Sequence, residues 1–201
     1  KKSNYDCIIP VSGGKDSTWQ TLTALEYGLK PLCITWRTPV RTEVGKKNLQ
    51  NLINLGVDHY DVSINPKIEK EFSLKTFKKL GSPAIPMHMA LHAIPVNLAI
   101  KLKVPLILWG ENSAFEYGGS DSKLKGSRLN NDWRKKYGNY YSLNLEKWTE
   151  KNFSYKDLSI YSVPSDRSIK KARVQELFLG HFFKWDPIKN YKIVKKYNFK
   201  T

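Results

Sequence analysis

The segment Ser12-Gly13-Gly14-Lys15-Asp16-Ser17 has the residue types of a phosphate-binding loop. It follows an apolar run at 7–11 and opens a stretch with helical spacing. A glycine pair between a strand and a helix lets the backbone approach an anion, and the first free N–H groups of the helix then point at that anion. Lys15 adds a positive charge, and Asp16 supplies the hard oxygen ligand that Mg²⁺ prefers beside phosphate. The segment therefore predicts a site for phosphates and Mg²⁺.

This loop differs from the common GxxxxGK[ST] nucleotide loop, because the first glycine of that pattern would fall on Ile9 and its Ser/Thr on Asp16. It resembles instead the SGGxDS loop of the PP-loop ATP pyrophosphatase superfamily. The resemblance implies cleavage of ATP between its α- and β-phosphates, adenylation of a substrate oxygen, and release of pyrophosphate. Taken alone, a glycine-rich turn that binds nothing is the alternative interpretation.

Apolar runs and helical stripes alternate along the chain, which predicts a parallel sheet covered by helices on both faces. Alternation of Tyr60, Val62 and Ile64 with polar residues predicts a half-exposed edge strand. We expect an open parallel α/β sheet of about five strands, and the resemblance implies the PP-loop, or adenine nucleotide alpha hydrolase-like, fold. The expected strands are 7–11, 32–36, 60–64, 105–109 and 177–182.

Helical spacing predicts a helix after the loop, with one stripe formed by Leu22, Leu25 and Leu29. Further helices are expected around 49–53, over 65–81, over 87–103 and from 186 onward. Pro95 lies inside the helix expected over 87–103, so a kink or break is expected there.

One core with elaborations is the natural organisation for 201 residues of which 40% are hydrophobic. We expect a nucleotide-binding core over 1–119, an elaboration over 120–172 where the apolar period fades, and the last core strand and helix over 173–201. Because the first residue is Lys1, the chain is expected to be a fragment or a processed form.

The formal net charge of +16 would suit a nucleic-acid partner, but lysines scattered over solvated helix faces explain it equally well. No apolar run is long enough to span a membrane, and no signal-peptide pattern is present. Cys7 and Cys33 fall in predicted buried strands without a CxxC pattern, so we expect small core residues. A reducing, ATP-containing cytoplasm is the expected location.

Further segments narrow the resemblance to the N-acetyl sugar amidotransferases, the PP-loop enzymes of surface-polysaccharide (lipopolysaccharide O-antigen) and nonulosonic-acid biosynthesis. The similarity runs from about Tyr5 to Phe199, although members of that family are longer at both ends. The segments that carry it are 42–45 (TEVG), 48–52 (NLQNL), 86–89 (PMHM), 108–119 (LWGENSAFEYGG) and 178–187 (FLGHFFKWDP).

The resemblance implies a ligase that converts the acetamido group of a sugar or sugar nucleotide to an acetamidino group. Its cofactors would be ATP and Mg²⁺, and a separate glutaminase subunit would supply ammonia. The chain itself offers no cysteine in the context of a glutaminase nucleophile, because Cys7 and Cys33 lie in predicted strands.

The loop residues are expected to contact different parts of ATP and its metal ion. Lys15 is expected to neutralise phosphate charge, and Asp16 is expected to bind Mg²⁺. The residues expected to contact pyrophosphate are Ser12, Gly13, Gly14 and Ser17.

Polar residues at the carboxyl ends of the other strands should converge on the same ligand. We expect Thr35 and Trp36 near adenine. Gly110, Glu111 and Asn112 are expected at the α-phosphate and the acceptor, with Glu111 as a possible second metal ligand.

Several other residues have two interpretations each. His88 and His92 stand four apart on one predicted helix face, but the glutamate that follows the first histidine in zinc peptidases is missing, so His88 either faces the substrate or is packed. His181 is either at the rim of the site or a core histidine. Glu116 and Tyr117 form either a substrate loop or an ordinary turn.

Two other functions remain open from the sequence. One is a tRNA-modifying PP-loop enzyme, for which the basic charge would be functional, although no catalytic cysteine pair is present. The other is a non-catalytic nucleotide-binding module, for which Asp16 would have no purpose.

Overall fold

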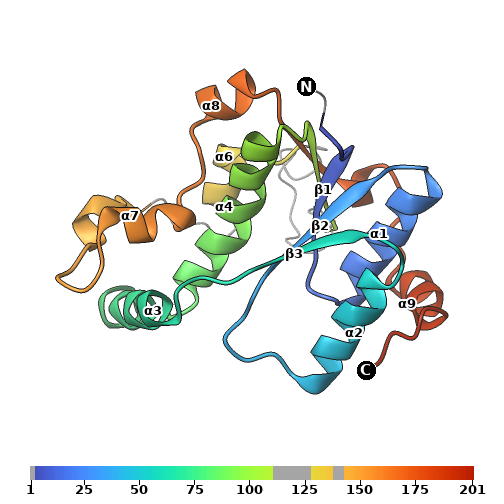
Figure 1. The fold of residues 1–201 in the computed structure, drawn as a ribbon, viewed down its shortest axis with the longest axis horizontal. Coiled ribbons are helices and arrows are strands. Elements are labelled where there is room, and N and C mark those ends of the chain that lie inside the picture. The colour runs from blue at the N-terminus through green and yellow to red at the C-terminus, as the bar shows by residue number, and fades with distance from the viewer. Residues whose placement is uncertain (1–2, 111–127, 138–142) are drawn as a thin grey trace.

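The computed structural model describes residues 3–110, 128–137 and 143–201, and it contains a five-stranded parallel sheet with helices on both sides (Figure 1). The strand order is β3-β2-β1-β4-β5, and each neighbouring pair is parallel. The expected open α/β sheet is therefore confirmed, with β3 at an edge as predicted. The strands are β1 (Cys7–Pro10), β2 (Pro31–Trp36), β3 (Asp58–Val62), β4 (Leu106–Trp109) and β5 (Gln175–Phe178).

β5 ends earlier than the sequence pattern predicts. Its last residue, Phe178, pairs with Trp109, which is the last residue of β4. Past that point the chain turns into the short 3₁₀ helix η4 (Leu179–His181). His181 therefore lies in a turn beyond the strand and is exposed.

Alternate residues of the strands enter different cores, as the two-residue period of a strand requires. Ile8, Ile34 and Ile107 belong to a large core on one face, whereas Ile9 and Cys33 belong to a smaller core on the other. Both cysteines are buried and free, as expected for core residues.

The helices divide between the two faces of the sheet (Figure 1). Helices α1, α2 and α9 lie on one side, and α3, α4 and α6 lie on the other. The helices are α1 (Lys15–Glu26), α2 (Glu43–Ile53), α3 (Pro66–Leu80), α4 (Ile85–Leu102), α6 (Asn131–Lys136), α7 (Tyr155–Leu158), α8 (Asp166–Lys171) and α9 (Pro187–Lys195), with 3₁₀ helices η2 (Leu145–Trp148) and η3 (Ser159–Tyr161). None of the helices in the described part of the chain is both long and apolar enough to cross a membrane.

Helix α1 buries threonines where the sequence pattern predicts a leucine stripe. Leu22 and Leu25 are only half-buried, whereas Thr18, Thr21 and Thr23 are buried. Each threonine hydroxyl donates to the carbonyl one turn earlier in the helix, over 2.8–3.0 Å. Because these bonds satisfy the hydroxyls, the methyl groups can pack against the sheet.

The sequence predicted a kink or a break at Pro95, and the structure shows that the break does not occur, because α4 continues from Ile85 to Leu102. Proline removes one hydrogen bond and costs about 3 kcal/mol in a helix interior. Ten residues of α4 are buried, Pro95 among them, and this packing on several sides offsets the cost.

Described residues between 129 and 161 pack into the large core of the sheet. Leu129, Trp133 and Tyr161 belong to the same core as Ile8. Leu129 N also donates to the carbonyl of Glu176 on β5, over 3.1 Å.

A buried ion pair fixes α6 to the edge of the sheet. Arg134 is 0% exposed, and its guanidinium contacts the carboxylate of Glu176, which also accepts from Trp109 Nε1 over 3.2 Å. Burial raises the pKa of Glu176, while the charge of Arg134 opposes that rise. A charge of this kind is tolerated in the interior only while its partner is present.

Arg134→Met is expected to lower the free energy of unfolding by about 3 to 5 kcal/mol, because it leaves the Glu176 carboxylate buried and unpaired. The double variant Arg134→Met/Glu176→Met removes both charges and should lose less than the single variant. Urea denaturation measures both losses. Glu176→Met completes the cycle, and a double variant that loses the sum of the losses in Arg134→Met and Glu176→Met would show that the pair is not coupled.

Candidate functional site

The loop Ser12–Ser17 lies at the carboxyl end of the central strand β1 and leads directly into α1. Gly13 has φ +78°, which is the left-handed region that favours glycine. A Cβ at this position would lie 2.7 Å from the backbone nitrogen of Leu49 on α2. The loop therefore needs glycine here both for its conformation and for its close approach to α2.

The two serines of the loop have different hydrogen bonds. Ser17 Oγ donates to the carbonyl of Gly14 over 3.1 Å, and it accepts from Ser12 N over 3.4 Å. Ser12 Oγ accepts from Gly14 N over 3.2 Å. The hydroxyl hydrogen of Ser17 is thus used inside the loop, whereas that of Ser12, an exposed residue, remains available for a ligand.

The start of α1 suits an anion. Gly14 is the N-cap residue, and no side chain caps the helix there. By contrast, side chains of Thr42, Asn65 and Asp186 cap α2, α3 and α9. The first N–H groups of α1 and its positive dipole end therefore face the loop without a competing side-chain acceptor.

Lys15 and Asp16 form an ion pair in the first turn of α1. Their side chains are 26% and 39% exposed, so both can reach a ligand. Lys15 Nζ also lies 5.7 Å from the centre of the Trp185 ring, and Trp185 packs edge-on against Trp19 of α1. One carboxylate beside phosphate oxygens and water fits the way proteins hold Mg²⁺ with a nucleotide.

Gly110, which follows β4, lies against the same helix. A Cβ there would be 2.5 Å from Gln20 Oε1 and 3.7 Å from the carbonyl oxygen of Asp16. The structure thus brings Gly110 to the loop. Gln20 is fully buried, and neither of its amide atoms has a hydrogen-bond partner in the described part of the chain. No feature of the sequence singled out Gln20, although it stands one helical turn after Asp16.

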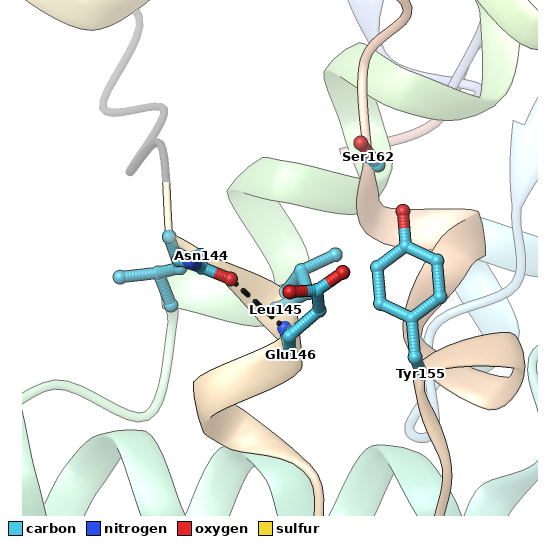
Figure 2. A pocket seen from close by; sticks show the side chains of 6 residues that line it. Asn144, Leu145, Glu146, Tyr155 and Ser162 are labelled. Atoms are coloured by element: carbon cyan, nitrogen blue, oxygen red, sulfur yellow. Dashed lines mark hydrogen bonds between the residues drawn. The ribbon is translucent and has the colours of Figure 1, made fainter.

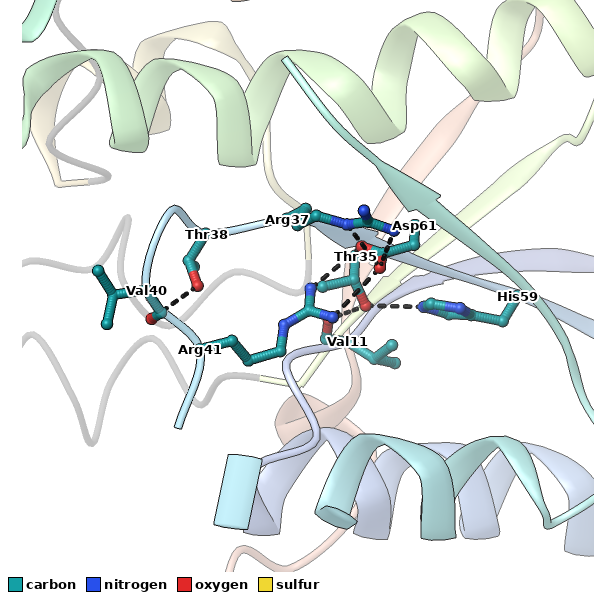
Figure 3. Close-up of polar contacts among 8 residues, drawn as sticks. All are labelled: Val11, Thr35, Arg37, Thr38, Val40, Arg41, His59 and Asp61. Carbon is teal, nitrogen blue, oxygen red and sulfur yellow. Dashed lines mark hydrogen bonds and ion pairs between the residues drawn. The ribbon is translucent and has the colours of Figure 1, made fainter. Parts of the chain in front are cut away.

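Thr35 and Trp36 end β2 and lie on opposite faces of the sheet. The Thr35 hydroxyl donates to the carbonyl of Val11 over 2.7 Å, so it accepts from His59 Nε2 at 2.9 Å (Figure 3). Trp36 packs in the large core and is 8% exposed. The two side chains do not meet, and their contact with adenine stays a prediction.

Arg37 and Arg41, which both follow β2, surround Asp61 near the end of β3 (Figure 3). Asp61 accepts from Arg37 Nε over 3.0 Å and from both terminal nitrogens of Arg41 over 3.2 and 3.0 Å. Partial burial raises the pKa of Asp61, but the bonds from Arg41 and Arg37 outweigh that effect and hold it below its usual value. Sequence patterns did not identify this cluster, because its members meet only through the pairing of β2 with β3 and the course of the chain after β2.

The predicted histidines lie on other elements. His88 is half-buried on α4, and burial lowers its pKa. His92 is buried one turn later, with its ring 5.5 Å from that of Trp109. No three potential metal ligands cluster among the residues that the structure describes. Glu111, Asn112, Glu116 and Tyr117 lie outside the described residues.

A recess of about 320 Å³ opens in the segment 143–162 (Figure 2). None of the residues predicted for the ATP site contributes to it. It is lined by Leu143, Asn144, Leu145, Glu146, Tyr155 and Ser162.

No protein-family model matches the sequence, and no curated protein matches it. Similar solved structures include a predicted subunit of a tRNA methyltransferase from Methanocaldococcus jannaschii, at 13% identity and TM-score 0.46, covering 96% of this chain and 76% of that chain. NMN synthetase from Francisella tularensis is similar at 12% identity and TM-score 0.42, covering 98% of this chain and 88% of that chain. At such identities the likeness concerns the fold alone.

Gly13→Ala is expected to destabilise the chain and to abolish binding of ATP, because the new Cβ meets the backbone of Leu49. Gly28→Ala is the matched control. Gly28 also has a positive φ but has no atom near its Cβ position, so only the conformational cost of about 1 to 2 kcal/mol applies. Urea denaturation and calorimetric titration with ATP compare the two. Equal effects of the two variants would show that the contact with α2 is unimportant.

His59 makes the free energy of unfolding depend on pH. Burial lowers its pKa in the folded state, with Asp61 opposing and Arg41 adding to the effect. The unfolded state therefore binds the proton more tightly than the folded state. Above about pH 6.5 His59 is neutral in both states and costs no stability, whereas the free energy of unfolding falls as the pH drops toward 5. His59→Gln, which keeps a donor for Thr35, should reduce that fall, and adding His88→Gln should reduce it further. Urea denaturation from pH 7 to 5 measures the free energy of unfolding of each protein. The same slope of that free energy against pH in wild type and in both variants would contradict the prediction.

Proposed function

We propose that this protein is an ATP-dependent amidotransferase, which forms AMP and pyrophosphate while it converts the N-acetyl group of a sugar or sugar nucleotide to an acetamidino group. The observation that supports the use of ATP is the loop Ser12–Ser17, with its left-handed glycine, its uncapped helix and the adjoining Lys15 and Asp16. The amidotransferase reaction rests on the resemblance of 86–89, 108–119 and 178–187 to that family.

The loop would hold the β- and γ-phosphates of ATP. The first N–H groups of α1 and the Ser12 hydroxyl would donate to the phosphate oxygens, and Lys15 would balance their charge. Mg²⁺, when bound by Asp16, would neutralise part of the charge that builds on the departing pyrophosphate. Glu111 and Asn112 stay predictions for the acceptor side.

The reaction solves the problem that an amide carbonyl is a poor electrophile. The acetamido oxygen attacks the α-phosphorus of ATP, the bond from that phosphorus to the bridging oxygen of the β-phosphate breaks, and pyrophosphate leaves. The amide nitrogen loses its proton, which gives an O-adenylyl imidate. Ammonia then adds to the imidate carbon, AMP leaves with the former acetyl oxygen, and the acetamidino group remains. The donors of the loop act where charge builds in the first step.

Ammonia would come from a separate glutaminase subunit. Cys7 and Cys33 are buried in strands, and burial raises the pKa of each thiol to about 12. Neither can serve as the thiolate nucleophile that hydrolyses glutamine. We place the reaction in the cytoplasm, where ATP and sugar nucleotides are available.

Incubation with ATP, ammonium and N-acetylated sugar nucleotides should yield AMP and pyrophosphate, and glutamine should not replace ammonium. Asp16→Asn keeps the shape of the side chain and should slow the single-turnover rate by about a hundredfold, with a smaller effect on ATP affinity. Lys15→Ala should also weaken ATP binding, more so at low salt.

Nucleotide analysis, single-turnover kinetics and mass spectrometry of the acceptor measure these outcomes. ADP as the only nucleotide product would refute the proposed reaction. An Asp16→Asn variant with the wild-type rate would instead support a nucleotide-binding module without catalysis.

A further inference from the structure

We propose that Arg37, Arg41 and Asp61 form a second oxyanion site, which binds a phosphate of the acceptor substrate beside the ATP loop. The acceptor would then be a phosphorylated compound, such as the diphosphate of a sugar nucleotide, and not a free sugar. The identity of the acceptor rests on the proposed function, whereas the oxyanion site itself rests on the geometry of the cluster.

Asp61 holds both guanidinium groups in place. Its two oxygens accept from Arg37 and Arg41 through the bonds described above, and Arg37 Nη2 lies 2.8 Å from the carboxylate as well (Figure 3). Side chains fixed in this way lose less conformational entropy when a ligand binds, because the ordering has already taken place. The guanidinium groups are thus oriented to donate paired hydrogen bonds to two oxygens of a phosphate.

The cluster keeps an excess of positive charge. Two guanidinium groups face one carboxylate, and each guanidinium has five N–H donors, more than Asp61 accepts. The side chain of Arg37 is 54% exposed and that of Arg41 is 20% exposed, so a ligand can reach both. Nearby Glu43 is paired with Lys46, so it does not cancel the excess.

The position of the cluster fits a second substrate. Asp61 is aligned with Thr35 in the β2–β3 register, and Thr35 bonds to Val11, the residue before the phosphate loop. Two strand spacings, or about 10 Å, therefore separate the cluster from the loop along the same edge of the sheet. Arg41 also directly precedes Thr42, the N-cap of α2, whose positive dipole end adds to the field.

A purely structural role accounts for less of this arrangement. One arginine would suffice to satisfy Asp61, and an ion pair as exposed as that of Arg37 contributes little to stability. A purely structural role predicts that anion binding is unchanged when Arg37 is replaced. The experiment below therefore distinguishes the structural role from the binding role.

The test measures pyrophosphate binding to the full chain by calorimetry, with the phosphate loop saturated by the non-cleavable analogue α,β-methylene-ATP. We expect wild type to bind pyrophosphate under these conditions. Arg41→Gln and Arg37→Gln should each weaken that binding by about tenfold or more, because each removes charged hydrogen bonds. Affinity for α,β-methylene-ATP should change less than twofold. Lys47→Gln, which removes an exposed positive charge from α2, is the matched control and should bind pyrophosphate as wild type does.

Competition separates the two proposals. If UDP-N-acetylglucosamine displaces pyrophosphate and N-acetylglucosamine does not, both the site and a phosphorylated acceptor are supported. If pyrophosphate binding depends on the arginines but the sugar nucleotide does not compete, the site stands and the acceptor assignment fails.

Absence of pyrophosphate binding in the presence of the analogue would overturn the site, as would equal losses in Arg37→Gln and Lys47→Gln. Arg37 is the decisive position, because its exposed side chain makes loss of folding a poor explanation for any change.

Discussion

The contact between Gly13 and the backbone of Leu49 is the constraint on which the loop depends. A side chain at residue 13 would overlap the backbone of Leu49 in the middle of α2. The loop and α2 can therefore come this close only because residue 13 is glycine. The loop is then held between β1, α1 and α2 before any ligand arrives. Preorganisation of this kind matters for an anion site, because backbone donors act best when they need not move.

Helix α2 connects this loop to the far end of the chain. Asn48 exchanges two hydrogen bonds of 2.8 Å with the backbone of Lys200, and Asn51 donates to the carbonyl of Asn198 over 2.7 Å. The tail that these asparagines hold follows α9, and the segment before α9 places Trp185 near Lys15. Residues about the phosphate loop are thus fixed by contacts between segments far apart in the sequence.

The sequence predicted the strands and the loop because these depend on local patterns. Apolar runs identified the sheet, and Asp186-Pro187 marked the start of α9, where Asp186 caps the helix. The burial of threonines in α1 was not predictable, because it depends on hydroxyl bonds to the helix backbone. The end of β5 at Phe178, level with Trp109 of β4, was not predictable either, because the apolar run of the sequence continues to Phe182.

Long-range contacts explain why the rest of the site was missed. Arg41 and Asp61 are separated by α2 in the chain, and they meet because the segment between β2 and α2 folds back over the end of β3. Thr35 and Trp36 are adjacent residues of a strand and point to opposite faces, so the structure does not bring their side chains together, and their contact with adenine stays a prediction. Alternation therefore limits how many neighbouring strand residues can contact one ligand.

The net charge of +16 does not by itself indicate what the protein binds, because the positive side chains differ in their surroundings. Lys75 is largely buried, where its ammonium donates to two backbone carbonyls, pairs with Glu150 and lies 5.8 Å from the Trp148 ring centre. That charge is part of the structure and is not offered to a ligand. Arg37, by contrast, is fixed by a carboxylate and still exposed. Positive residues that are both oriented and accessible can recognise a particular anion, such as a small phosphorylated substrate. A high net charge without such an arrangement gives only a general attraction to polyanions such as nucleic acid.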